Sequence, residues 1–236
     1  MSSTGTGKKP EKLYRPGYRS GEVNKMLPIG DDNREVKEFP YVTGGLIALN
    51  VLFFIVELMQ GDAFIETWAF VPSRFLADPA GQWLTIFTSM FMHAGWLHIG
   101  GNMLYLGIFG DNVENRFGHF RYLVFYLICG VAATFAQLAV DRSSVLNLGA
   151  SGAIAGVLAA YLVLYPTKEV TVVLGWVVTR LPAIIVIGLW IVLQWFSEIG
   201  SILGAADTSG VAYMAHIGGF GAGLLLTLIF QGQGEA

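Results

Sequence analysis

Long apolar runs recur between residues 41 and 230 of the chain. Several of them reach about 18 residues, the length that a helix needs to cross the hydrocarbon core of a bilayer. The pattern predicts six spanning helices, at about 41–59, 97–115, 120–140, 150–165, 179–199 and 211–230. We therefore predict an all-α membrane protein built as a six-transmembrane-helix bundle. Residues 170–178 are apolar but too short to span, so we interpret them as an interfacial segment or an extension of the fifth helix.

The connection between the first and second predicted helices, about 60–96, is too apolar for a free loop. It contains Trp68, Phe70, Phe75, Trp83, Leu84, Phe87, Met90 and Phe91. Non-helical backbone at membrane depth must be buried in protein or line a cavity, because no water is there to satisfy its polar groups. We expect this first loop to be partly embedded in the membrane, with its aromatic side chains at the interface.

Residues 1–39 differ from the rest of the chain because they are polar and carry eight of its fourteen Lys and Arg residues. They lack periodic apolar positions, so we predict a disordered tail followed by one domain at 40–236. The basic residues could contact anionic lipid or simply set the topology. Because basic residues favour the cytoplasmic side, we expect both termini to be cytoplasmic. The helices at 150–165 and 211–230 would then run from outside to inside.

The composition supports a membrane location and limits the chemistry. Charged residues are 13% of the 236 residues, against about 25% in soluble domains, and hydrophobic residues are 54%. The single cysteine, Cys129, excludes an intramolecular disulfide and a cysteine-based zinc site. The net charge of -3 is uninformative by itself, and we expect no nucleic-acid partner.

Polar side chains are costly inside a bilayer and are often functional there. The four that matter most in the predicted helices are His98, Asn102, Ser151 and His216. His98 and Asn102 share one helix face, since residues four apart align. All four lie in the outer halves of their helices, so we expect them to converge on one water-accessible pocket. Considered singly, the serine could be a helix-packing residue and each histidine an interfacial hydrogen-bonding group.

Small residues at four-residue spacing adjoin Ser151 in one helix and His216 in another, and such spacing lets membrane helices approach closely. The two series are Gly152, Gly156 and Ala160, and Ala215, Gly219 and Gly223. Packing them together would bring the serine hydroxyl within hydrogen-bond reach of the imidazole, as in a base-activated nucleophile. The Ser151 amide, at a helix N-terminus, and the side chains of His98 and Asn102 could donate to an oxyanion. No Asp or Glu is spaced to orient His216, so we predict a dyad rather than a triad.

Four motifs, in this order along the chain, resemble those of the rhomboid family of intramembrane serine proteases. They are His93-Ala-Gly-Trp-Leu-His98-Ile-Gly-Gly-Asn102, Glu114-Asn-Arg116-Phe-Gly118, Gly149-Ala-Ser151-Gly152 and Ala215-His216-Ile-Gly-Gly219 with Gly223. The resemblance implies that Ser151 is the nucleophile and His216 the general base. It implies an oxyanion hole formed by His98, Asn102 and the Ser151 amide.

The resemblance also implies structural roles for Glu114 and Arg116. We expect a group of glycines to pack the helices near the site, namely Gly149, Gly152, Gly156, Gly219 and Gly223. Two positions depart from the family pattern. Leu84 follows Trp83 where the family often has arginine, and Ala155 stands where many members have an aromatic ring that stacks on the histidine. The orientation of the histidine must then come from another part of the chain.

The resemblance implies a serine endopeptidase that cleaves peptide bonds in or near the transmembrane helices of single-pass or other membrane-protein substrates. Substrates would enter between the second and fifth helices, where Trp190, Trp195 and Phe196 could line the entrance or face lipid. The reaction needs no metal or cofactor. The alternative is a catalytically inactive rhomboid-like protein that binds transmembrane clients. The arrangement of six spanning helices fits a prokaryotic inner membrane, with the site opening to the outside. The sequence leaves the oligomeric state open.

Overall fold

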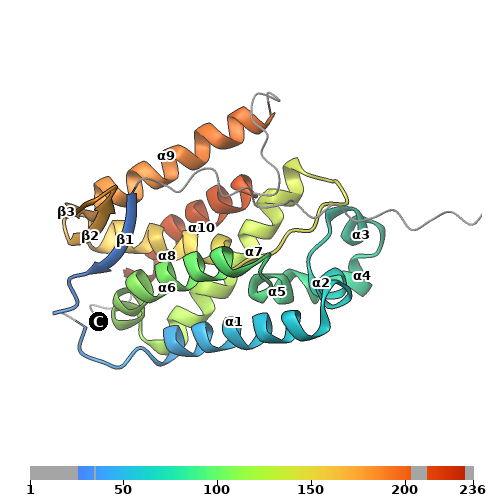
Figure 1. Cartoon of the computed structure of the whole chain (residues 1–236), viewed down its shortest axis with the longest axis horizontal. Coiled ribbons are helices and arrows are strands. Elements are labelled where there is room, and N and C mark those ends of the chain that lie inside the picture. The colour runs from blue at the N-terminus through green and yellow to red at the C-terminus, as the bar shows by residue number, and fades with distance from the viewer. Residues whose placement is uncertain (1–25, 35, 203–211, 232–236) are drawn as a thin grey trace, which may run out of the picture.

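The computed structural model describes residues 26–34, 36–202 and 212–231, and this part of the chain is mostly helical (Figure 1). Its long helices are α1 (Tyr41–Gln60), α6 (Trp96–Phe117), α7 (His119–Val140), α8 (Ser151–Leu164), α9 (Ala183–Ile202) and α10 (Tyr213–Gln231). Each overlaps a range that the sequence predicts to be helical, with ends that differ by up to four residues. Three of them, α1, α7 and α10, are long and apolar enough to cross a membrane, whereas α8 and the apolar part of α9 are shorter.

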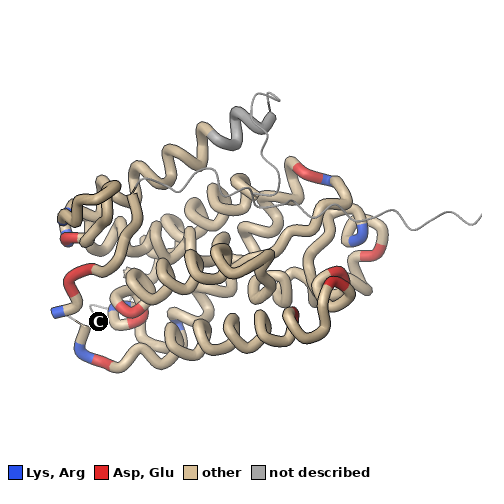
Figure 2. The backbone as a smooth tube through the Cα atoms, in the orientation of Figure 1, with Lys and Arg blue, Asp and Glu red and all other residues tan. Residues whose placement is uncertain are grey.

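The charged residues of the described chain gather toward the two ends of the long axis, and the helical middle is almost free of them (Figure 2). Many apolar side chains of the helices are exposed, including Leu52 on α1, Phe135 on α7 and Leu225 on α10. An apolar outer surface of this kind is stable in contact with lipid. The arrangement is that of an integral membrane protein.

Helix α8 forms the centre of the bundle, where α7 and α10 pack against it (Figure 1). Every residue from Gly152 to Tyr161 is buried. A helix that is apolar and small-residue-rich on all sides has no face suited to water, so it is covered by its neighbours. Its first residue, Ser151, is thereby held in a fixed position inside the bundle.

The connection at 60–96 is folded into short helices rather than an irregular loop. These are α2 (Asp62–Trp68), α3 (Pro72–Ala77), α4 (Pro79–Gln82), α5 (Thr85–Thr88) and the 3-10 helix η1 (Ser89–Phe91). Phe70 is fully buried, and its backbone pairs with Asn147 just before α8. Trp83 and Leu84 are exposed. The connection is therefore part protein core and part exposed apolar surface.

A three-stranded antiparallel sheet corrects the all-α expectation. Its strands are β1 (Met26–Asp31), β2 (Glu169–Leu174) and β3 (Val177–Pro182), in the order β1-β2-β3. The segment interpreted as interfacial is a β-hairpin rich in valine, a residue that favours strands. Gly175 provides the positive φ of its turn.

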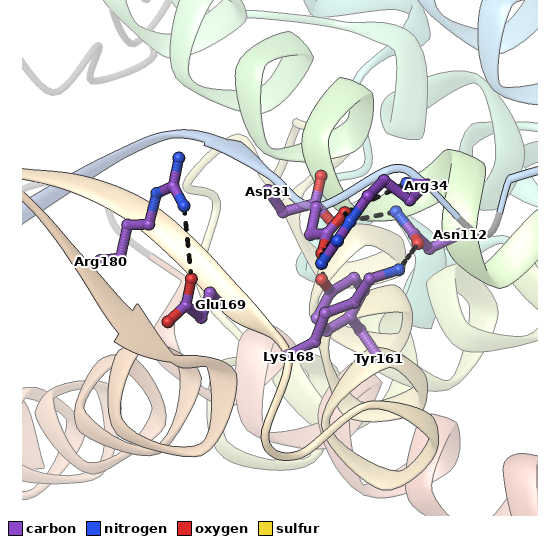
Figure 3. A network of polar contacts seen from close by, with 8 residues as sticks. Asp31, Arg34, Asn112, Tyr161, Lys168, Glu169 and Arg180 are labelled. Atoms are coloured by element: carbon purple, nitrogen blue, oxygen red, sulfur yellow. Dashed lines mark hydrogen bonds and ion pairs between the residues drawn. The ribbon is translucent and has the colours of Figure 1, made fainter.

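Strand β1 also corrects part of the expected disordered tail, because residues 26–31 pair with β2. Residues 1–25 lie outside the described residues. A polar network fixes β1 to the helices (Figure 3). Asp31 Oδ2 accepts hydrogen bonds from the Tyr161 hydroxyl at 2.5 Å and from Asn112 Nδ2 at 2.9 Å. The Lys168 ammonium group donates to Asn112 Oδ1. Burial raises the pKa of Asp31 to about 6.

Candidate active site

Ser151 and His216 meet although they are 65 positions apart in the chain. Ser151 is the first residue of α8, and His216 lies in the first turn of α10. His216 Nε2 lies 2.7 Å from Ser151 Oγ, a distance at which the hydroxyl can donate to the ring nitrogen. The geometry is therefore suited to proton transfer from the serine to the imidazole.

Glycines bring the two helices to this distance. A Cβ atom added at Gly219 would lie 2.8 Å from the Gly152 carbonyl carbon, and one at Gly223 would lie 2.6 Å from Gly156 Cα. Both distances are too short for a side chain, so α8 and α10 are in backbone contact. Ala133 of α7 is a third partner, because a Cβ at Gly152 would lie 2.5 Å from its methyl group. The contribution of α7 was missed from the sequence, although small residues are frequent along it.

Gly149 has a more specific role than helix packing. Its φ of +126° is a conformation that side chains disfavour. A Cβ there would also lie 2.8 Å from His98 Nε2. Its amide donates to the Ser89 carbonyl at 2.9 Å, which fixes the segment before α8 to η1. Glycine at this position therefore lets the imidazole of His98 approach Ser151.

His98 presents its Nε2 atom to Gly149, two residues before Ser151. The Ala94 amide donates to His98 Nδ1 at 3.3 Å, so Nδ1 carries the lone pair and Nε2 carries the proton. Asn102 follows one turn later on α6 and is buried, and its Nδ2 has no hydrogen-bond partner among the described residues. A buried amide donor without a partner is costly unless a ligand or a reacting group uses it.

The other side of His216 contacts two residues of α9 that the sequence analysis did not assign to the site. His216 Nδ1 lies 2.8 Å from Gln194 Oε1. The ring of Trp190, treated above as an entrance or lipid-facing residue, lies 5.6 Å from the imidazole between ring centroids. The sequence did hold a signal for Gln194, because a polar side chain within an apolar helix is rare and costs free energy in a bilayer. A second glutamine, Gln137 of α7, accepts from the Ala215 amide at 3.2 Å.

A small pocket adjoins the serine on the side of α7. Its lining includes Phe70, Thr134, Gln137, Asn147 and Ser151. Besides the Ser151 hydroxyl, the lining has the hydroxyl group of Thr134 and the side-chain amides of Gln137 and Asn147. The pocket could therefore hold water next to the reacting hydroxyl.

The Glu114 carboxylate joins α6 to the start of α1. It accepts from the amides of Val42 at 2.8 Å and Thr43 at 2.7 Å, and lies 2.6 Å from His119 Nδ1. These amides are among the first in α1, which have no partner within the helix. Arg116, in contrast, is exposed and makes no hydrogen bond or ion pair within the described chain. Of these two residues, therefore, only Glu114 makes a contact that joins helices in the described chain.

A helical bundle with an apolar outer surface, in which a serine hydroxyl contacts a histidine ring nitrogen between two helices, defines the chain as an integral membrane protein of a particular kind. Comparison with known families makes the assignment specific. The Rhomboid domain matches residues 80–233, more than half of the chain. The chain belongs to the rhomboid family.

The curated relatives include plant and bacterial proteins. The chain is 27% identical over 193 residues to Rhomboid-like protein 11, chloroplastic, of Arabidopsis thaliana, covering 77% of this chain and 66% of the relative. It is 30% identical over 199 residues to Rhomboid protease GluP of Bacillus subtilis (strain 168), covering 80% and 38%. It is 30% identical over 222 residues to RHOMBOID-like protein 1 of Arabidopsis thaliana, covering 81% and 54%.

The chain thus spans less than two thirds of the length of each of these relatives. Relatives that are named as proteases place the chain in a family that includes serine proteases. Because the relatives include plant proteins as well as bacterial ones, they give no support to the expectation of a prokaryotic inner membrane.

Proposed function

We propose that this chain is an intramembrane serine endopeptidase that cleaves peptide bonds in or near the transmembrane helices of other membrane proteins. The proposal rests on one observation above all, the 2.7 Å contact between His216 Nε2 and Ser151 Oγ. Family membership supports the same reaction class.

In the proposed reaction the Ser151 hydroxyl attacks the scissile carbonyl while His216 Nε2 takes its proton. The oxyanion that forms receives hydrogen bonds from the Ser151 amide, His98 Nε2 and Asn102 Nδ2. His216 then protonates the leaving amine, and the acyl-enzyme is hydrolysed by water that His216 deprotonates. The pocket beside Ser151 is a suitable source of that water. The proposed steps use only groups of this chain, the substrate and water.

The substrate is proposed to be a transmembrane helix that unwinds locally, because a helix engages its carbonyl groups in internal hydrogen bonds. The 14 residues of α8 extend about 21 Å, less than the roughly 30 Å of the hydrocarbon core. A short central helix can therefore begin below the membrane surface, which would place Ser151 at the depth of a substrate helix.

We further propose that all six long helices cross the membrane, with both termini in the cytoplasm and Ser151 near the outer side. The first-loop helices α2–α5 would then lie in the outer leaflet. Strand β1 pairs with the hairpin β2–β3, so we propose that the protease domain begins near Met26 rather than at residue 40.

A fluorophosphonate probe tests the proposal directly, because it reacts with an activated serine. In detergent, wild-type protein should be labelled, whereas Ser151→Ala and His216→Ala should not. Cleavage of a reconstituted single-pass substrate should show the same dependence. Labelling of the wild type at the level of Ser151→Ala would contradict the proposal and favour an inactive protein that binds transmembrane clients.

A further inference from the structure

His216 is hydrogen-bonded through both of its ring nitrogens. Nε2 contacts Ser151 Oγ at 2.7 Å, and Nδ1 contacts Gln194 Oε1 at 2.8 Å. The two partners come from different helices, α8 and α9, on opposite sides of the ring. A histidine held at both nitrogens has one tautomer and one ring orientation.

We propose that Gln194 is a positioning residue that sets the tautomer and orientation of His216, together with the Trp190 ring beside it. This inference rests on the proposed function, because it assigns Gln194 the task of preparing the general base. Gln194 does not touch the reacting atoms and acts only through His216.

The chemistry of the amide explains the tautomer. A carbonyl oxygen can only accept a hydrogen bond, so His216 Nδ1 must carry the proton that it donates to Gln194 Oε1. Nε2 is then left with a lone pair, which it needs in order to accept the Ser151 proton. An aspartate performs this orienting task in soluble serine proteases. A neutral amide does so at a smaller desolvation cost, which suits a site inside a bilayer.

Trp190 adds a second constraint from the same helix. It lies four residues before Gln194, so both side chains project from one face of α9. Its ring is inclined by 42° to the imidazole, with 5.6 Å between the centroids. Ala155 of α8 is fully buried and presents no ring. The ring contact with His216 that Ala155 of α8 cannot make is therefore made by Trp190 of α9. His216 is held in this orientation only while α9 packs against α10.

Three variants of the full chain test this role. Gln194→Met keeps the length of the side chain but removes the acceptor, and Gln194→Glu keeps an acceptor and adds a charge. Leu193→Met is the matched control, because it introduces the same side chain at an exposed position of α9. The rate of fluorophosphonate labelling is measured from pH 5 to pH 9, with the thermal unfolding midpoint of each variant.

We expect Gln194→Met to label roughly five- to tenfold more slowly, the effect of one lost hydrogen bond on the barrier, while Leu193→Met labels like the wild type. Gln194→Glu should retain labelling but reach half its maximal rate at a higher pH, because a carboxylate stabilises the imidazolium form. His98 is the other titratable group that faces His216, and it is unchanged in these variants.

Equal labelling of Gln194→Met and wild type would overturn the inference. If Gln194→Met is poorly folded, an unshifted pH profile of Gln194→Glu would overturn it equally well. A readout independent of catalysis separates this inference from the proposed function. Nitrogen NMR of labelled histidine, assigned with His216→Ala, should show a protonated Nδ1 in the wild type and a mixture of tautomers in Gln194→Met. A protein that fails to label but shows this change would contradict only the protease proposal, whereas an unchanged spectrum would overturn the role of Gln194.

Discussion

The Tyr161 hydroxyl donates a 2.5 Å hydrogen bond to Asp31 Oδ2, joining two residues that are 130 positions apart. Tyr161 lies in the last turns of the central helix α8, and Asp31 ends strand β1. Ser151 begins the same helix, ten residues earlier and about 15 Å away. A single helix, α8, thus connects the candidate active site to the attachment of β1.

Removing the Tyr161 hydroxyl should weaken the attachment of β1 without unfolding the helical bundle. In Tyr161→Phe the ring still fills its buried site, but Asp31 loses one donor, at a cost of about 1 kcal/mol. We expect hydrogen exchange of the β1 amides to become roughly fivefold faster. Tyr105→Phe on α6 is the control, because no hydrogen bond of its hydroxyl is found among the described residues. Unchanged exchange in Tyr161→Phe would show that strand pairing alone holds β1.

The attachment of β1 should also depend on pH. Burial raises the pKa of Asp31 to about 6, above its ordinary value of 3.8. The folded strand therefore binds a proton more tightly than the released strand does, so its stability is greatest at low pH and is lost as pH rises through 6. The groups facing Asp31 are Tyr161, Asp111, Lys168 and Asp32.

Protection factors of the β1 amides, corrected for intrinsic exchange, should fall roughly three- to tenfold between pH 5 and pH 7.5, an effect reduced by partial exposure. Asp31→Asn should remove most of this dependence, because an asparagine does not titrate. Arg34 lowers the pKa of Asp32, so that residue stays ionised over this range and cannot cause the change. A constant protection factor in the wild type would contradict the assignment to Asp31.

The helices were predictable because each one contains a run of apolar residues, and such a run is by itself a strong signal for a membrane helix. The meeting of Ser151 and His216 was anticipated from their small-residue neighbours, which permit close helix contact. The sheet was not predicted, because β1 lies in a polar segment whose pairing partner is more than 130 residues away. Gln194 was missed for another reason. Its role depends on the rotation of α9 about its axis, which no spacing within a single helix reveals.

The first turn of α1 should depend on the Glu114 carboxylate. Glu114→Ala leaves the amides of Val42 and Thr43 without their acceptor in a buried environment, at a cost of about 2–4 kcal/mol. The thermal unfolding midpoint of Glu114→Ala should fall clearly. The midpoint of Glu114→Gln should fall less, because its amide oxygen still accepts a hydrogen bond. Glu169→Ala is the control, since its exposed ion pair with Arg180 contributes at most about 1 kcal/mol. Equal midpoints for Glu114→Ala and this control would refute the capping role.

Gly219 and Gly221 provide a matched pair of substitutions on α10. A methyl group at Gly219 would overlap the backbone of Gly152, whereas one at Gly221 meets no atom within 4 Å. Gly219→Ala should push α10 away from α8 and separate His216 from Ser151. Because a displacement of about 1 Å can cost roughly 100-fold in rate, fluorophosphonate labelling should fall at least tenfold. Gly221→Ala should label like the wild type. If both variants label equally, the backbone contact between α8 and α10 does not position the histidine.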